Sequence, residues 1–265
     1  MPTGRVGDIE LFYELVDCTE PWKAGRPPVV FLHGLGGTHR MWIHQIPAFC
    51  ADFPTIVPDL RGHGSSSKPD MEWSTLEMAQ DVGRLLRDLG VERAHIVGCS
   101  LGGMVAQQFA LEYPHATASL VLVDTLCGIP AELRDVARSS LEFIEKNPMS
   151  VVAKERITNA FSDQVDSVMR DYYIGVIAQN EKASYLRAAR AAFGFSICHR
   201  LDEIKAPTLV VVGEADRVTP PPLSEDLASR ISAARLVRIA GAGHISNVER
   251  PAAFNETVRE FLLAL

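Results

Sequence analysis

Five short runs rich in valine, isoleucine and leucine constrain the fold of this chain more than any other feature. They lie at 29–34 (VVFLHG), 55–60 (TIVPDL), 94–98 (AHIVG), 119–124 (SLVLVD) and 208–213 (TLVVVG). Continuous apolar runs of this length are typical of parallel strands that are covered on both faces. Helical patterns separate the runs, so the sequence predicts an α/β fold with a mostly parallel, doubly wound sheet.

The flanking segments fit this scheme. Residues 8–16 (DIELFYELV) alternate apolar and polar side chains, which predicts an edge strand exposed on one face. Ser74 and Glu77 have the spacing of a helix capping box, and apolar residues continue one helical face beyond them. A second amphipathic helix is predicted after Pro251. Strand signals also recur at about 236–239, just before the last helix.

The alternation of strand and helix stops after about Cys127 and resumes only at Pro207. The intervening segment consists of consecutive helical patterns. We therefore predict a helical cap over residues 128–204, inserted after the sixth strand, and a core domain formed by residues 1–127 and 205–265. Ligands in open α/β sheets bind at the carboxyl ends of the strands, which is where such a cap would lie.

Composition excludes several classes of function. A length of 265 residues fits one large domain, and a net charge of −7 without a Lys/Arg cluster argues against nucleic acid or anionic membranes as partners. No apolar run is long enough to span a membrane, and the N-terminal residues lack a signal-peptide pattern. We therefore expect a cytoplasmic protein.

The cysteines support the same expectation. There are five, at wide spacings and without a CxxC pair. An odd number in this pattern predicts reduced thiols rather than a disulfide framework or a zinc site. No cluster of metal ligands occurs, and no metal or organic cofactor is expected. The sequence leaves open whether the protein is a monomer or a homodimer.

The segment Gly98-Cys99-Ser100-Leu101-Gly102 joins a predicted buried strand to a predicted helix. Strand, Gly-x-Ser-x-Gly, helix is the pattern of a nucleophile elbow, in which a sharp turn projects the serine hydroxyl into a cleft. Glycines are needed at the flanking positions because strand and helix cross closely there. Ser100 is thus the predicted nucleophile. Cys99, one position from the apex, is expected to point into the core.

A serine nucleophile needs a base and an acid. His244 follows the predicted last strand and is the candidate base. Asp216, after the preceding strand, is the leading candidate acid; Asp124 at the end of the 119–124 strand is an alternative, and Glu214 is a weaker third. The order Ser100, Asp216, His244 is the one expected for this fold.

An oxyanion hole needs two N–H donors near the serine. One is the backbone N–H of Leu101, directly after Ser100. The loop His33-Gly34-Leu35-Gly36-Gly37 places the N–H of Leu35 as the second.

The substrate pocket is harder to predict. Trp42, which follows the His-Gly loop, is a candidate wall of the pocket, and several cap residues are further candidates. A dicarboxylate substrate would need cap cations, for which arginines at 156, 187 and 190 are available. The cap candidates are Phe143, Phe161, Tyr172, Arg187 and Phe193.

With these motifs in this order, the chain resembles the α/β-hydrolases with a helical cap, and within them the 3-oxoadipate enol-lactonases and their carboxylesterase relatives. The segments that carry the resemblance are HGLGGTHRMW, PDLRGHGSSSKP, GCSLGGMVAQQFA, GEADRVTPP and GAGHISNVERPAAFN. The resemblance is weakest across the cap. It implies a Ser100–His244–Asp216 triad, with Leu35 and Leu101 as oxyanion donors.

The expected activity is that of a serine hydrolase that cleaves a small-molecule carboxylic ester or lactone through an acyl-enzyme, as the enol-lactonases do. A C–C bond hydrolase or a cofactor-free perhydrolase would use the same triad. The C–C hydrolases usually carry tryptophan directly after the catalytic histidine, where this chain has Ile245. From a different class, a non-catalytic ligand receptor would keep the fold without turnover.

Overall fold

The computed structural model describes residues 3–23 and 25–265, and within these residues eight strands form a single sheet. The order across the sheet is β1-β2-β4-β3-β5-β6-β7-β8. Strands β3 to β8 are parallel, whereas β2 pairs antiparallel with both β1 and β4. The strands are β1 (Thr3–Val6), β2 (Ile9–Val16), β3 (Val29–Leu32), β4 (Thr55–Pro58), β5 (Ala94–Cys99), β6 (Thr117–Val123), β7 (Thr208–Gly213) and β8 (Arg235–Ile239).

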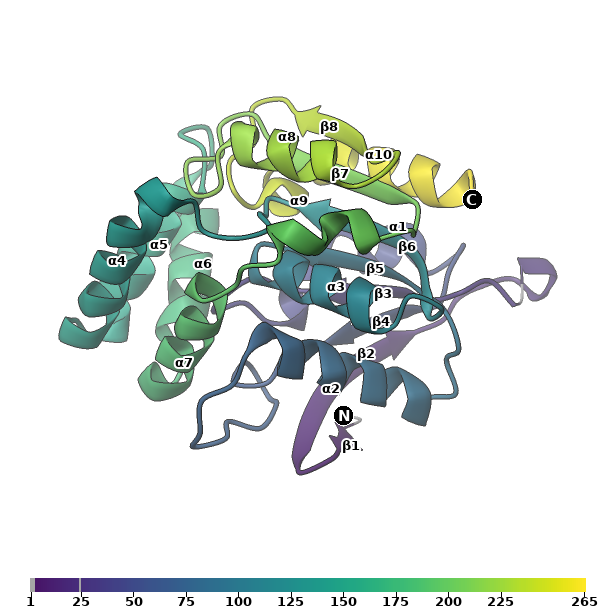
Figure 1. Cartoon of the computed structure of the whole chain (residues 1–265), viewed down its shortest axis with the longest axis horizontal. Helices are drawn as coiled ribbons and strands as arrows, with labels where there is room; N and C mark the ends of the chain where they lie inside the picture. Colours follow the sequence, from purple (N-terminus) through teal and green to yellow (C-terminus); the bar gives the residue numbers. More distant parts are fainter. Residues whose placement is uncertain (1–2, 24) are drawn as a thin grey trace.

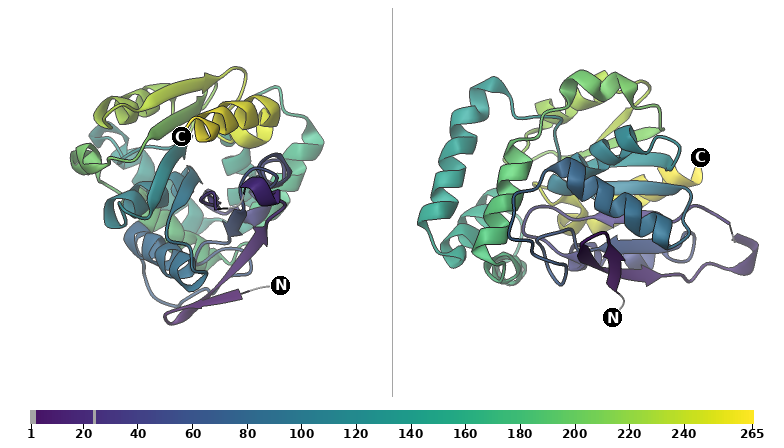
Figure 2. Two further views of the ribbon diagram at one scale, coloured as in Figure 1. Left: turned by 90° about the vertical axis from the view of Figure 1, so that its right-hand side faces the viewer. Right: turned by 60° about the horizontal axis from the view of Figure 1, so that its bottom comes forward.

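Helices cover both faces of the sheet (Figures 1 and 2). The apolar faces of α2, α3 and α8 build one core cluster with the sheet, and α1, α9 and α10 build the other. The predicted capping box at the start of α2 is present: Ser74 and Glu77 bond each other's backbone N–H. The core helices are α1 (Ile46–Phe49), α2 (Thr75–Asp88), α3 (Leu101–Glu112), α8 (Pro221–Arg230), α9 (Ser246–Glu249) and α10 (Pro251–Leu263).

The chain between β6 and β7 forms a helical insert, as the sequence predicts. In Figure 1 the insert stands beside the sheet as a separate group of helices. The pocket described below lies between this insert and the loops that follow β3, β5, β7 and β8. Its helices are α4 (Arg134–Lys146), α5 (Met149–Ala160), α6 (Ser167–Ala178) and α7 (Lys182–Phe193). Short 3₁₀ turns lie at Pro21–Lys23, His39–Trp42, Ala131–Leu133 and Cys198–Glu203. The exact domain boundaries at 128 and 204 stay a prediction.

One strand differs from the prediction. The strand at 9–16 is not the edge of the sheet, because β1 pairs along its outer side through Thr3 to Val6. The segment of β1 contains a glycine and an arginine and has no run of apolar residues, which is why its pattern gave no strand signal. No helix among the described residues is long and apolar enough to cross a membrane.

The expectation that all five cysteines are reduced thiols is wrong, because Cys127 and Cys198 form a disulfide. The two lie 71 residues apart in the sequence, at the beginning and the end of the insert. The chain returns to the place where it left the core: the N–H of Ile197 donates to the carbonyl of Cys127 at 2.9 Å, and Gly128 pairs with Ser196 as an isolated bridge. The cysteine pattern therefore no longer supports a cytoplasmic location.

Loss of this disulfide should destabilise the fold. For Cys127→Ala/Cys198→Ala we expect the free energy of unfolding to fall by about 2–4 kcal/mol, because the bond restricts a long loop in the unfolded chain. Urea unfolding with and without reductant measures this, with Cys18→Ala/Cys50→Ala, which removes two free thiols, as the matched control. Five reactive thiols in the denatured, unreduced protein would contradict the disulfide.

Candidate active site

Ser100 lies at the apex of a sharp turn between β5 and α3. Its backbone has φ 53° and ψ −116°, a conformation that residues with a side chain rarely adopt. A Cβ at Gly98 would lie 2.2 Å from the carbonyl oxygen of Gly102, and one at Gly102 would lie 2.1 Å from that of Leu32. Both positions therefore require glycine, for the steric reason that the sequence pattern implies.

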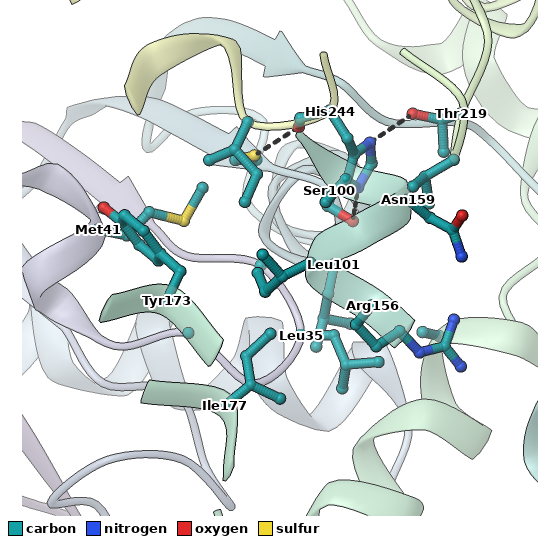
Figure 3. A pocket seen from close by; sticks show the side chains of 18 of the residues that line it. Leu35, Met41, Ser100, Leu101, Arg156, Asn159, Tyr173, Ile177, Thr219 and His244 are labelled. Carbon is teal, nitrogen blue, oxygen red and sulfur yellow. Dashed lines mark hydrogen bonds between the residues drawn. The ribbon is translucent and has the colours of Figure 1, made fainter. Parts of the chain in front are cut away.

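The structure brings Ser100, His244 and Asp216 together in a chain of hydrogen bonds. The Oγ of Ser100 lies 3.0 Å from Nε2 of His244, and Nδ1 of His244 lies 2.9 Å from Oδ2 of Asp216. A carboxylate can only accept, so Nδ1 carries a proton and donates it to Asp216. In the neutral ring Nε2 is then an acceptor for the hydroxyl of Ser100 (Figure 3).

Thr219 completes the surroundings of the carboxylate and was not identified from the sequence. Its hydroxyl donates to Oδ2 of Asp216 at 2.8 Å and lies 3.2 Å from Nδ1 of His244. Oδ1 of Asp216 accepts the backbone N–H groups of Val218 and Thr219, at 2.8 and 2.9 Å. An aspartate followed three residues later by threonine is a local turn signal that could have indicated this arrangement.

The other candidate acids are placed differently. Asp124 is buried, but its carboxylate bonds backbone and side-chain donors other than the His244 ring. Glu214 is exposed. Cys99 is buried, its Sγ lies 4.0 Å from the carbonyl oxygen of His244, and burial raises the pKa of its thiol well above the ordinary value.

Burial and nearby charges have opposite effects on the pKa values of His244 and Asp216. Burial alone would lower the pKa of His244, but the carboxylate of Asp216, with smaller contributions from Asp124 and Glu249, raises it above the ordinary value. Burial alone would raise the pKa of Asp216, but His244 and the donors of Thr219 lower it. The arrangement therefore favours an ionised Asp216 beside a histidine that readily takes up a proton.

The two residues predicted to supply the oxyanion hole are Leu35 and Leu101. Leu101 begins α3, and Leu35 lies in the loop after β3; in the described part of the chain neither N–H donates to another group. Both residues border the pocket. A helix N-terminus and a free loop N–H are suited to bind an oxyanion.

His33 holds the loop that carries Leu35. Its Nδ1 donates to the carbonyl of Gly34 at 2.8 Å, and its Nε2 accepts the N–H of Leu60 at 2.9 Å. Burial lowers the pKa of His33, which keeps the ring neutral and able to make both bonds. From the insert, Asn180 donates to the carbonyl of Gly36 at 2.9 Å, so the loop is held from two sides.

A pocket opens above Ser100 and is mostly apolar (Figure 3). Met41 and Leu35 come from the core, and Tyr173 and Ile177 come from α6 of the insert. Arg156 and Asn159 on α5 add polar groups to the wall. Among the predicted pocket residues, Tyr172 and Phe193 border this space.

The other predicted pocket residues do not border it. Trp42 is fully buried and packs against Phe31 and Phe254, because its turn points the preceding Met41 to the pocket and Trp42 to the core. Phe161 lies behind the pocket wall, with its ring edge-on to Tyr173 at 5.5 Å. Phe143 is half-buried and packs against the core cluster that contains Trp42 and Phe161. Arg187 forms an ion pair with Asp70 outside the pocket.

Comparison with known proteins places this architecture. The model of the "Alpha/beta hydrolase family" matches residues 29–257, most of the chain. The chain belongs to this family. The match begins at β3 and ends within α10, so it includes the turn at Ser100, Asp216 and His244.

The proteins similar to this chain include enzymes named as lactonases and as esterases. The chain is 28% identical to 3-oxoadipate enol-lactonase 1 of Acinetobacter baylyi, over 90% of each chain. The crystal structure of the enol-lactonase from Burkholderia xenovorans has a TM-score of 0.91 at 27% identity and covers 99% of this chain and 100% of that one. A thermophilic esterase from Thermogutta terrifontis has a TM-score of 0.87 at 28% identity, covering 97% and 94%.

Proposed function

We propose that this alpha/beta hydrolase is a serine hydrolase that cleaves a carboxylic ester or lactone of a small molecule. The observation that carries the proposal is the 3.0 Å contact between the hydroxyl of Ser100 and an acceptor nitrogen of His244, at a strained turn that faces a pocket. A strained residue with an activating base is the arrangement that nucleophilic catalysis needs.

The geometry supports one role for each group. Ser100 attacks the carbonyl carbon while His244 takes its proton, and Asp216 stabilises the resulting imidazolium. The N–H groups of Leu35 and Leu101 bind the oxyanion of the tetrahedral intermediate. His244 then returns the proton to the departing alcohol. In the second half of the reaction water attacks the acyl carbon while His244 takes its proton, and this proton returns to the oxygen of Ser100 as the acid leaves.

The pocket wall and the relatives support the proposed substrate class. The wall of the pocket is mainly apolar, which suits the short acyl chain or the ring of a small ester or lactone. Relatives named as an enol-lactonase and an esterase support both lactones and open esters. Arg156 borders the pocket, whereas Arg187 and Arg190 are paired with acidic residues on the surface. A substrate with two carboxylates would therefore meet few cap cations.

A substrate panel tests the proposal. It contains p-nitrophenyl esters of increasing acyl length, neutral lactones, 3-oxoadipate enol-lactone and a vinylogous diketone. We expect turnover of esters or lactones and none of the diketone. Cleavage of the diketone alone would favour the C–C bond hydrolase, and binding without turnover of any compound would favour a receptor.

The pH dependence of kcat/KM should report the pKa of His244. The imidazolium cannot accept the proton of Ser100, so kcat/KM rises with pH through the pKa of His244. Because the net effect of Asp216 and the other carboxylates is to raise that pKa, we expect the midpoint above the ordinary histidine value of about 6.5. Initial rates of a neutral ester between pH 5 and 9 measure the midpoint. A midpoint well below 6 would contradict this assignment.

A further inference from the structure

Asp124 is a buried carboxylate behind the candidate active site. It follows β6 directly, does not border the pocket and is fully buried. Its φ of 46° lies in the left-handed region, which aspartate adopts more readily than most residues. A group in this position cannot touch a substrate, so any part in the reaction must be exerted through its neighbours.

The carboxylate of Asp124 joins the two segments that carry Asp216 and His244. Its Oδ1 accepts the N–H of Gly213 at 2.8 Å, at the end of β7 and three residues before Asp216. Its Oδ2 accepts the N–H and the hydroxyl of Ser246, at 2.9 and 2.7 Å, two residues after His244. Two of the three donors are backbone N–H groups, which suits an ionised carboxylate.

Several titratable groups lie around this carboxylate. Burial, and after it the nearby Asp216, raises the pKa of Asp124 to about 7, although His244 and the donors of Ser246 act in the opposite direction. The buried thiol of Cys99 lies close enough for both carboxylates to raise its pKa. Glu249 faces His244 from α9 and bonds the N–H of Gly243 at 2.8 Å. In its ionised form, which dominates above a pH of about 7, Asp124 thus belongs to the group of charges that act on the imidazole.

We propose that Asp124 is a positioning residue for the base: its carboxylate ties the loop of His244 to the end of β7 and adds negative charge behind the imidazole. The proposal rests on the proposed function for its kinetic consequences, though not for its effect on His244 itself. Asp124 and Asp216 thus have different roles, because only Asp216 bonds Nδ1 of His244 directly.

Asp124→Asn tests the proposal because it keeps the shape and removes the charge. An amide presents one acceptor and one donor group, so at least one N–H of Gly213 or Ser246 loses its partner. We expect kcat to fall about 10- to 100-fold, as for a catalytic group that is slightly displaced. Loss of the charge disfavours the imidazolium, so the acidic limb of kcat/KM should move to lower pH by about half a unit to one unit.

Controls separate positioning from folding. Asp52→Asn removes another buried carboxylate, which bonds Lys23 and Arg259 and precedes β4, at the amino ends of the parallel strands. It should lower stability without moving the pH profile. Ser246→Ala removes one bond of the tie and keeps the carboxylate itself, so it should lower kcat several-fold and move the acidic limb less than Asp124→Asn does. If Asp124→Asn does not fold, Ser246→Ala still tests the tie, and unchanged kcat in it would overturn the proposal.

An NMR titration of the His244 ring makes the test independent of activity. We expect a lower pKa of His244 in Asp124→Asn than in the unchanged protein, whether or not a substrate is turned over. Should the substrate panel fail, this shift still decides the inference about Asp124. An identical His244 titration and an identical kcat in Asp124→Asn would overturn it.

Discussion

Replacement of Ser100 by alanine is expected to lower kcat for the best ester or lactone by a factor on the order of 10⁶. Without the hydroxyl there is no atom at the turn to form the acyl-enzyme, and His244 has no proton to accept. Steady-state rates and labelling by a fluorophosphonate probe measure this loss. We expect no label on the alanine variant.

The control for this variant is Ser229→Ala on α8. That hydroxyl donates only to the carbonyl of Asp226, on an exposed helix face, and its removal should leave turnover and labelling unchanged. Alanine at position 100 keeps a side chain at the same positive φ, so the melting temperature should stay close to that of the unchanged protein. Persistent labelling of Ser100→Ala would disprove the role of Ser100.

Asp216→Asn is expected to lower kcat by about 10⁴-fold, the loss typical of a triad histidine held in the wrong tautomer. Oδ1 of Asp216 accepts two backbone N–H groups, from Val218 and Thr219, which fixes the oxygen of the amide on that side. The amide NH₂ then faces Nδ1 of His244 and donates to it. The ring proton moves to Nε2, where it blocks the transfer from Ser100.

An exposed aspartate serves as the control for Asp216→Asn. Asp163→Asn removes a carboxylate that is paired with Arg217 on the surface, and it should not affect kcat. Activity close to normal in Asp216→Asn, together with complete loss in Asp124→Asn, would show that the acid is Asp124. The two aspartates are thus distinguished by the size of the loss, since we expect the larger effect at position 216.

The sequence predicted the parts of the fold that depend on local patterns. Strands β3 to β7 are continuous apolar runs because both of their faces are buried, and such runs are typical of covered parallel strands. The turn at Ser100 was predictable for the same kind of reason, since close crossing of strand and helix demands glycine at 98 and 102. The segment of β1 has no such signature.

Features that depend on distant contacts could not be predicted in this way. Cys127 and Cys198 meet only because the insert returns to its starting point, which no spacing rule reveals. Trp42 and Met41 are neighbouring apolar residues, and only the packed structure shows that Met41 borders the pocket while Trp42 fills the core. The donors around Asp124 likewise come from distant segments, the end of β7 and the start of α9.

The insert leaves the sheet after β6 and re-enters it at the same place, where a covalent bond and a backbone bridge join its two ends. The insert also contacts the core elsewhere, since Asn180 donates to the carbonyl of Gly36 and the carbonyl of Ala160 accepts the N–H of His244. The insert supplies pocket residues such as Tyr172, Tyr173 and Ile177. The core supplies the reactive groups of Ser100, Asp216 and His244. Substitution of the pocket side chains of the insert can consequently change which molecules bind, provided that the backbone contacts of the insert with His244 and Gly36 are kept.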